Sequence, residues 1–186
     1  MRLDDPTPPT TPIALVGMMG AGKTSIGKRL AARLGRPFVD ADRELEARCG
    51  VPVSTVFELE GEDGFREREA RVIDDLTAGS SLVIATGGGA VLLPENRAHL
   101  AARCFVVYLR AGSHEIWLRT RRDRSRPLLQ TADPRGRIEA LMAARDPLYR
   151  EVADVVVDTG RQPMERVVVA IIDRLPAVLS GAAPHG

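Results

Sequence analysis

The sequence predicts an α/β fold of three layers, in which helices cover both faces of a parallel sheet of five strands. Three observations predict this class. Short β-branched runs alternate with helical patterns along the chain. Those runs are apolar on both faces, as strands covered on both sides by helices are. The 186 residues suit one domain with a sizeable core.

The expected strands and helices follow one another from residue 12. The five strands are "PIALVG", "PFVD", "SLVIAT", "CFVVYLR" and "ADVVVDT". The first helix is "KTSIGKRLAARLG", where Ile26, Leu30 and Leu34 recur at helical spacing and Gly35 ends the helix. The other helices are expected in "ADRELEARCG", "VSTVFELEG", "EDGFREREARVIDDLTAG", near "SHEIWLRTRRD", and in "PMERVVVAIIDRLPAVL".

The domain is expected to span residues 12–176. Residues 1–11 are rich in Pro and Thr and are expected to form a disordered extension, and residues 177–186 a flexible tail. Residues 121–137, "RRDRSRPLLQTADPRGR", carry little apolar periodicity. Such a segment inside a compact domain is either disordered or a functional lid.

Composition excludes several classes of function. The formal net charge of +1 gives no basic field for nucleic acid, and the arginine run at 121–126 lacks interleaved aromatic residues. No apolar run approaches the ~18 residues of a membrane helix, and the first residues lack the apolar core of a secretory signal. Cys49 and Cys104 lie far apart without CxxC spacing. We therefore expect a reduced, cytoplasmic protein without membrane or nucleic-acid partners.

The segment "GMMGAGKT" lies between the first strand and the first helix. Gly17-x-x-x-x-Gly22-Lys23-Thr24 matches the phosphate-binding P-loop. Glycine lets phosphate approach the backbone N–H groups and allows positive φ. The helix that starts at Lys23 directs its positive end at the anion, Lys23 reaches the β and γ oxygens, and Thr24 offers a hydroxyl to Mg²⁺. The motif predicts a nucleoside triphosphate site but no particular reaction.

Two carboxylates follow the second strand, in Asp40-Ala41-Asp42. If strand geometry persists, alternation places both on one side, at the sheet edge that holds the P-loop. One could then support Mg²⁺ through water while the other accepts an alcohol proton. The structural alternative is that Asp40 or Asp42 caps a helix.

Two further groups of residues have a structural and a functional interpretation. Arg66 and Glu69 are three residues apart on a predicted helix, so they form either a surface ion pair or an arginine oriented to grip a substrate carboxylate. Gly87-Gly88-Gly89 end the strand "SLVIAT". They form either a flexible turn or a place where a ligand touches backbone amides.

Taken together, these segments resemble the shikimate kinase family. The matching pieces are "GMMGAGKTSIGKRLA", "FVDAD", "VFELEGEDGFREREA", "IATGGGAV", "RPLL" and "RDPLYREVAD", in the family's order over residues 12–175. The resemblance implies a P-loop kinase fold with strand order 2-3-1-4-5, a substrate-binding region at about 40–75 and a mobile lid at about 121–137. It also implies ATP-dependent phosphorylation of the 3-hydroxyl of shikimate, with Mg²⁺ as cofactor.

The resemblance also assigns roles by position. Asp42 resembles the carboxylate that binds the shikimate hydroxyls, and Asp40 the outer partner of the Mg²⁺ bound by Thr24. Arg66 and Arg145 resemble the clamp on the shikimate carboxylate, and Gly88 a backbone contact to the substrate. Lys23, Asp42 and Arg126, the lid arginine of "RPLL", form the expected catalytic set. Contacts to the nucleotide are implied for Gly20, Ala21, Gly22, Lys23, Thr24, Ser25, Arg119, Arg126 and Arg161.

Two other functions remain open at this point. One is a kinase for another small acidic sugar such as gluconate. The other is a nucleotide-gated switch or binding module without transfer activity. A GTPase switch carries an Asn-Lys-x-Asp motif, whereas the single asparagine of this chain, Asn96, is followed by Arg97. We expect a monomer.

Overall fold

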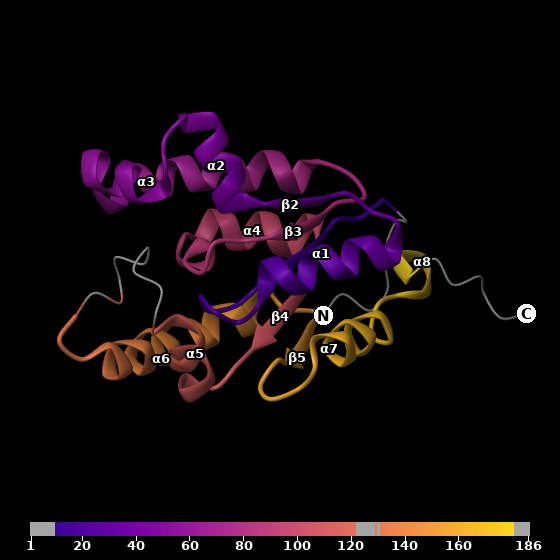
Figure 1. Cartoon of the computed structure of the whole chain (residues 1–186). Coiled ribbons are helices and arrows are strands. Elements are labelled where there is room, and N and C mark those ends of the chain that lie inside the picture. The colour runs from indigo at the N-terminus through magenta and orange to yellow at the C-terminus, as the bar shows by residue number, and fades with distance from the viewer. Residues whose placement is uncertain (1–9, 122–128, 130, 181–186) are drawn as a thin grey trace, which may run out of the picture.

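The computed structural model describes residues 10–121, 129 and 131–180. Its centre is one parallel sheet with the strand order β2-β3-β1-β4-β5 (Figure 1). The strands are β1 (Ile13–Val16), β2 (Phe38–Asp40), β3 (Val83–Ala85), β4 (Phe105–Arg110) and β5 (Val155–Asp158). The predicted fold class and strand order are confirmed.

Helices lie on both faces of this sheet (Figure 1). The α-helices are α1 (Lys23–Leu34), α2 (Ala41–Cys49), α3 (Val53–Ala78), α4 (Pro94–Arg103), α5 (Ser113–Thr120), α6 (Pro134–Val152), α7 (Met164–Ile172) and α8 (Ala177–Ser180). A single 3₁₀ turn, η1 (Ala90–Leu92), joins β3 to α4. Within the described residues, no helix is both long enough and apolar enough to cross a bilayer.

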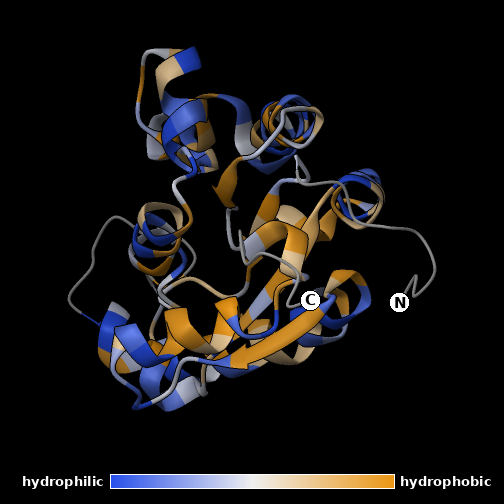
Figure 2. Ribbon diagram, turned by 90° about the vertical axis from the view of Figure 1, so that its right-hand side faces the viewer, coloured by the Kyte–Doolittle hydropathy of each residue, from blue (hydrophilic) through white to orange (hydrophobic). Residues whose placement is uncertain are grey.

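The core is divided by the sheet into two apolar clusters. Alternation along β1 sends Ile13 and Leu15 to one face and Ala14 and Val16 to the other. The first face packs against α1, α7 and α8, and the second against α3, α4 and α6. Figure 2 shows mostly apolar strands at the centre and helices of mixed polar and apolar residues around them. The sheet is thus a rigid base whose loops can hold a site.

Two long helices, α4 and α6, were not predicted, and α3 is broken where the sequence indicates. In α4, "PENRAHLAAR", Leu100 is the only large apolar residue, so no apolar stripe reveals the helix. The long α3 contains a kink at Gly61, whose φ of 72° lies outside helical values. That kink falls at the boundary between the two helices predicted from the sequence. Gly61 therefore divides α3 into residues 53–60 and residues 62–78, and the second part contains Arg66 and Glu69.

The end of the chain differs from expectation. The predicted last helix is interrupted before Pro176, since proline lacks an N–H and disfavours the helical conformation in the residue before it. Residues 177–180, predicted to belong to the flexible tail, form α8. Its Leu179 is buried in the apolar cluster that contains Ile13 and Leu15. Arg36 donates a hydrogen bond of 3.2 Å to the Leu179 carbonyl, which ties α8 to the domain.

Two predicted segments lie mostly outside the described residues. Of the extension at 1–11, only Thr10 and Thr11 are described, and their carbonyls accept hydrogen bonds from Ser81 and Arg36. Of the predicted lid at 121–137, residues 122–128 and 130 are not described. Residues 134–137 belong to α6, whose N-cap Asp133 accepts from the Gly136 N–H. This part of the segment is helical rather than irregular.

Candidate active site

A cavity of about 500 Å³ lies at the carboxyl edge of the sheet, where β1, β2 and β3 end. We call it the nucleotide cavity. It is lined by one continuous stretch of the chain, 19–26, and by residues from four other segments. Those residues are Asp40, Asp42, Thr86, Gly88, Arg119, Thr159, Gln162, Met164 and Val167. An open parallel sheet places ligands at this edge.

The P-loop takes the conformation that its glycines allow. Gly17, Gly20 and Gly22 have φ values of 143°, 77° and 98°, which side chains other than glycine rarely adopt. A Cβ at Gly17 would also lie 2.5 Å from the Leu109 carbonyl oxygen. Gly22 caps α1 without any side-chain hydrogen bond to the first turn. The first N–H groups of α1 therefore face the cavity, where an anion binds.

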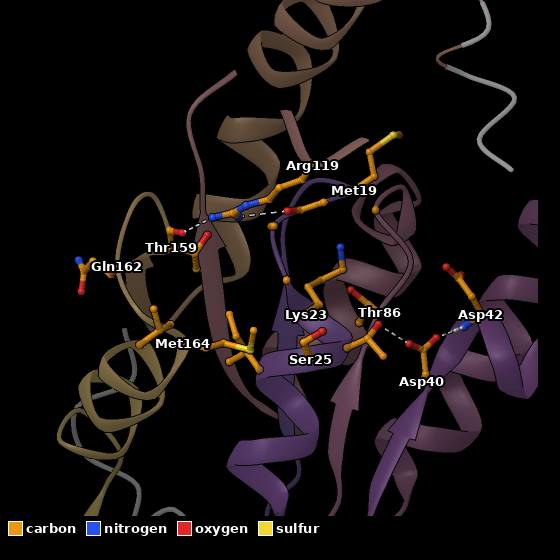
Figure 3. A pocket seen from close by; sticks show the side chains of 17 residues that line it. Met19, Lys23, Ser25, Asp40, Asp42, Thr86, Arg119, Thr159, Gln162 and Met164 are labelled. Atoms are coloured by element: carbon orange, nitrogen blue, oxygen red, sulfur yellow. Dashed lines mark hydrogen bonds between the residues drawn. The ribbon is translucent and has the colours of Figure 1, made fainter. Parts of the chain in front are cut away.

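Lys23 places a cation inside the P-loop. Its side chain is buried, and its ammonium donates hydrogen bonds to the carbonyls of Gly17 at 2.7 Å and Met18 at 3.0 Å. Figure 3 shows Lys23 between Arg119 on one side and the carboxylates of Asp40 and Asp42 on the other. The P-loop thus curls around its own lysine and holds a positive charge at the helix N-terminus.

Thr24 and Asp40 form a direct pair. The Thr24 hydroxyl donates to Asp40 Oδ2 at 2.6 Å, and Asp40 Oδ1 accepts from the backbone N–H groups of Asp42 and Arg43. Asp40 is therefore the N-cap of α2, which confirms the structural alternative for it. The predicted strand geometry does not persist, because α2 begins at Ala41. Asp40 and Asp42 still line one cavity, but a helix cap and not strand alternation brings them there.

A hydroxyl and a carboxylate in contact suit Mg²⁺. Mg²⁺ prefers oxygen ligands. In nucleotide sites the ion usually keeps several waters and binds one or two protein oxygens together with phosphate oxygens. Thr24 supplies one oxygen, and Asp40 lies within hydrogen-bond distance of it. The residues present therefore fit a magnesium ion held between Thr24, water on Asp40 and a phosphate.

Arg119 closes the far side of the nucleotide cavity. Its guanidinium donates to the carbonyls of Gly20, Thr159 and Gly160 at 3.2, 2.7 and 2.7 Å, so it links the P-loop to the segment after β5. Arg161, expected at the nucleotide, does not line this cavity. Its side chain is 87% exposed and lies 3.9 Å from Glu115, because the turn directs it into solvent and places Gln162 in the cavity wall.

A second cavity of about 510 Å³ adjoins the first. We call it the acceptor cavity. Met19, Asp42 and Gly88 line both cavities, so these residues form a shared wall. The other residues that line it come from α2, α3, α6 and the glycine turn: Glu46, Pro52, Val53, Ser54, Phe57, Glu62, Phe65, Arg66, Glu69, Gly87, Gly89 and Arg145.

Arg66 is held in place by carboxylates on its own helix. Its guanidinium donates to Glu69 at 2.6 Å and to Glu62 at 3.1 Å, and both Arg66 and Glu69 are buried. The functional interpretation of this pair is therefore favoured over a surface ion pair. Burial raises the pKa of Glu69, while the positive charge of Arg66 opposes that shift. Arg66 is thus a cation fixed at the cavity wall.

The glycine turn after β3 is packed tightly against these charges. A Cβ at Gly89 would collide with the Arg66 guanidinium. A Cβ at Gly87 would collide with Glu69 and lie 2.9 Å from Asp42 Oδ1. The carboxylates and the guanidinium thus lie directly beside the backbone of the turn, and a side chain at Gly87 or Gly89 would displace them.

Arg145 reaches the acceptor cavity from α6, 79 positions after Arg66 in the sequence. Its side chain is buried, and it donates to the Gly88 carbonyl at 3.2 Å. The structure thus brings together every predicted site residue that it describes except Arg161. Arg126 lies outside the described residues.

Comparison with known proteins settles the family. A family model described as shikimate kinase matches residues 19–176. The shikimate kinase of Cupriavidus pinatubonensis is 58% identical over 160 residues, which cover 86% of this chain and 83% of that protein. The chain belongs to the shikimate kinase family. Enzymes of this family phosphorylate shikimate with ATP and Mg²⁺.

Other shikimate kinases agree in sequence and structure. The enzyme of Bordetella avium is 56% identical over 170 residues, which cover 91% of this chain and 81% of that protein. A shikimate kinase from Acinetobacter baumannii, solved in complex with shikimate, superposes with a TM-score of 0.86 at 43% identity, covering 90% of this chain and 96% of that one. A gluconokinase from Sinorhizobium meliloti, at 18% identity and a TM-score of 0.55, shares the fold alone.

Several residues that line the two cavities were not predicted from the sequence. In this shikimate kinase family member they include Met19 in the shared wall, Thr86, Thr159 and Gln162 at the nucleotide, and Phe57 at the acceptor. Phe57 stacks on Phe65 with ring centroids 4.3 Å apart. Met19, Thr86 and Phe57 lie within segments that resemble the family, but their residue types alone do not indicate a place in a cavity wall.

Proposed function

We propose that the nucleotide cavity binds ATP with Mg²⁺, that the acceptor cavity binds shikimate, and that the γ-phosphoryl group passes between them to the 3-hydroxyl. The products are shikimate 3-phosphate and ADP. The observation that carries this proposal is the shared wall of Met19, Asp42 and Gly88. Two cavities that share a wall can place a donor phosphorus and an acceptor oxygen in contact, whereas separate cavities cannot.

On the donor side, the P-loop amides and Lys23 hold the β- and γ-phosphates. The ammonium of Lys23 exchanges its carbonyl acceptors for phosphate oxygens, which are stronger because they are charged. Thr24 and, through water, Asp40 hold Mg²⁺, which neutralises phosphate charge when it is bound. Gly20, Ala21, Gly22 and Ser25 contribute the remaining loop contacts, and Arg119 lies along the base.

On the acceptor side, two guanidinium groups bind the carboxylate of shikimate. Arg66 and Arg145 enter the acceptor cavity from different helices, so they can grip one carboxylate from two directions. Asp42 then accepts hydrogen bonds from hydroxyl groups, and the Gly88 backbone contacts the ring substituents. Since Arg66 and Arg145 line the acceptor cavity but not the nucleotide cavity, a carboxylate bound there leaves the opposite side of the ring to face the phosphate.

Catalysis at this site is mainly positioning and charge neutralisation. Phosphoryl transfer runs through a loose transition state, so little covalent work falls to the protein. Asp42 orients the 3-hydroxyl and accepts its proton, and Lys23 stabilises charge on the transferred group. Arg126 is proposed from the family resemblance to add a further positive charge over that group. We also propose that the protein acts in the cytoplasm as a monomer.

The proposal is tested by coupled ADP release with shikimate and with gluconate as acceptors. We expect shikimate to stimulate ADP release at least about a hundredfold above the rate with ATP alone, since water is a poorly positioned acceptor. Gluconate should give no stimulation, and mass spectrometry with ³¹P NMR should identify the product as shikimate 3-phosphate. No stimulation by shikimate, or equal stimulation by gluconate, would overturn the proposal.

A further inference from the structure

Tyr149 is a buried polar residue that lines neither cavity. It lies on α6, and its side chain is 0% exposed. Its hydroxyl donates a hydrogen bond of 2.5 Å to the carbonyl of Gly88 in the shared wall. Burial explains why this hydroxyl makes a hydrogen bond, because buried polar groups are normally hydrogen-bonded. Burial alone does not explain why the acceptor is the backbone of the glycine turn.

The Gly88 carbonyl receives a second donor from the same helix. Arg145 lies four residues before Tyr149, on the same face of α6, and donates to the same oxygen at 3.2 Å. A carbonyl oxygen has two lone pairs, so these two donors saturate it. Arg145 therefore shares its backbone anchor with Tyr149, and the position of one depends on the other.

Fixing this carbonyl also fixes the next amide. The peptide bond is planar and trans, so the Gly89 N–H points away from the Gly88 carbonyl and hence away from α6. Among the described residues, neither the Gly88 N–H nor the Gly89 N–H donates to an acceptor within the chain. Three glycines have no side chains with which to hold one orientation, and φ/ψ freedom is largest for glycine.

We propose that Tyr149 is a positioning residue for the acceptor substrate: its hydroxyl holds the Gly88 peptide so that the glycine amides and Arg145 are presented to the acceptor cavity in one arrangement. This inference rests on the proposed function, because it assumes that shikimate occupies that cavity. The effect should fall on the acceptor more than on ATP. Gly87, Gly88 and Gly89 all line the acceptor cavity, whereas only Gly88 lines the nucleotide cavity.

The chain supplies its own matched control in Tyr108. The two tyrosine rings stack with centroids 5.0 Å apart, and both are buried. The Tyr108 hydroxyl donates to Asp146 at 2.7 Å instead of to the glycine turn. Tyr108→Phe therefore removes the same atom from the same ring stack without touching Gly88. Burial raises the pKa of Tyr149 to about 12, so its hydroxyl stays a donor at every pH used in an assay.

The test compares Tyr149→Phe with Tyr108→Phe in the full-length protein. Calorimetry with shikimate alone should give a dissociation constant about fivefold weaker for Tyr149→Phe, the worth of one neutral hydrogen bond, and a value within about twofold of the wild type for Tyr108→Phe. The KM for shikimate should rise in parallel, while kcat and the KM for ATP change by less than about twofold. Equal shikimate affinity in both variants and the wild type would overturn the positioning role, as would equal weakening in both variants.

A second measurement leaves Tyr149 in place, so it can be made even if Tyr149→Phe does not fold. The sequence contains only two tyrosines, so 3-fluorotyrosine labelling of Tyr108→Phe gives a single ¹⁹F signal, from Tyr149. Saturating shikimate should shift that signal. An unshifted signal in a protein that binds shikimate would contradict the proposal. If the wild type binds no shikimate by calorimetry, the proposed function itself fails, and the two failures are thereby distinguished.

Discussion

The two cavities are built in different ways although they share a wall. The nucleotide cavity takes its anion-binding part from one continuous stretch, 19–26, in which backbone N–H groups and Lys23 lie side by side. The acceptor cavity takes its positive charges from Arg66 on α3 and Arg145 on α6, which come to one cavity only when the domain is folded. The first is a local structure, and the second is an assembled one.

This difference determines how each cavity depends on the rest of the protein. A P-loop needs a strand, three glycines with positive φ and the first turn of a helix, which are properties of a short sequence. The acceptor cavity needs the correct packing of α3, α6 and the glycine turn. Arg66 is held by carboxylates of its own helix α3, whereas Arg145 of α6 is held by the Gly88 carbonyl of the turn. Mutations near the phosphates should therefore affect chemistry, and mutations around the acceptor should affect binding and stability.

The largest effect is expected for Lys23→Ala. Removing the ammonium leaves the charge that develops on the transferred phosphoryl group without its nearest protein cation, so kcat should fall at least about 10³-fold. Steady-state assays measure the turnover, and calorimetry should show that shikimate still binds with an affinity within about threefold of the wild type. Substantial turnover in Lys23→Ala would contradict the phosphate role, and equal loss of shikimate binding would break the separation of the two cavities.

The next effect in size is expected for Arg145→Ala. Loss of one charged group from the carboxylate clamp should raise the KM for shikimate about a hundredfold, while the KM for ATP stays within about threefold. The matched control is Arg150→Ala on the same helix. Arg150 is exposed and pairs with Asp146, so its loss should leave both KM values nearly unchanged. Equal increases in the two KM values of Arg145→Ala would exclude the clamp assignment.

A third prediction compares two ion pairs on α3. Arg66→Ala leaves Glu69 buried without its partner, so the free energy of unfolding should fall by about 3 kcal/mol, besides the loss of shikimate binding. Arg68→Ala removes a pair with Glu60 whose side chains are 42% and 37% exposed, so it should lower the free energy of unfolding far less than Arg66→Ala does. Urea unfolding measures both values. Similar losses would mean that the acceptor cavity is not held together by its buried charges.

The same contrast explains what could be predicted from the sequence. The strands, their parallel arrangement and the P-loop follow from local patterns, because apolar runs and glycine spacing act over a few residues. Asp42 and Arg66 were candidates from local spacing, each with a structural alternative. Arg145 and its pairing with Arg66 were assigned only through the family resemblance, since no local pattern places α3 beside α6. Met19, Phe57 and Tyr149 lie inside segments that resemble the family, but nothing in those segments assigns them a role. They contribute through packing or through one hydrogen bond to a distant backbone.

The errors have local physical causes. The interpretation of Asp40-Ala41-Asp42 as continued strand is wrong because Asp40 accepts two N–H groups and starts α2 at once. The prediction of a flexible tail from residue 177 is wrong for 177–180. These residues form α8 after the interruption at Pro176, and the Leu179 side chain is buried in the core. Arg161 and Gln162 are neighbours, and which of them faces the nucleotide depends on the backbone of one turn.

The smallest effect is expected at Asp40, which links the P-loop to the rest of the site: it accepts a hydrogen bond from Thr24 and caps α2. Asp40→Asn keeps a good helix cap but removes the carboxylate charge beside Thr24, so the Mg²⁺ concentration for half-maximal rate should rise about tenfold. The control is Asp133→Asn, the same exchange at the N-cap of α6; Asp133 lines neither cavity, so the Mg²⁺ requirement should not change. Rates measured against Mg²⁺ at fixed ATP give both values. An unchanged requirement in Asp40→Asn would show that Asp40 acts only as a cap, and the metal would then depend on the P-loop and the phosphates alone.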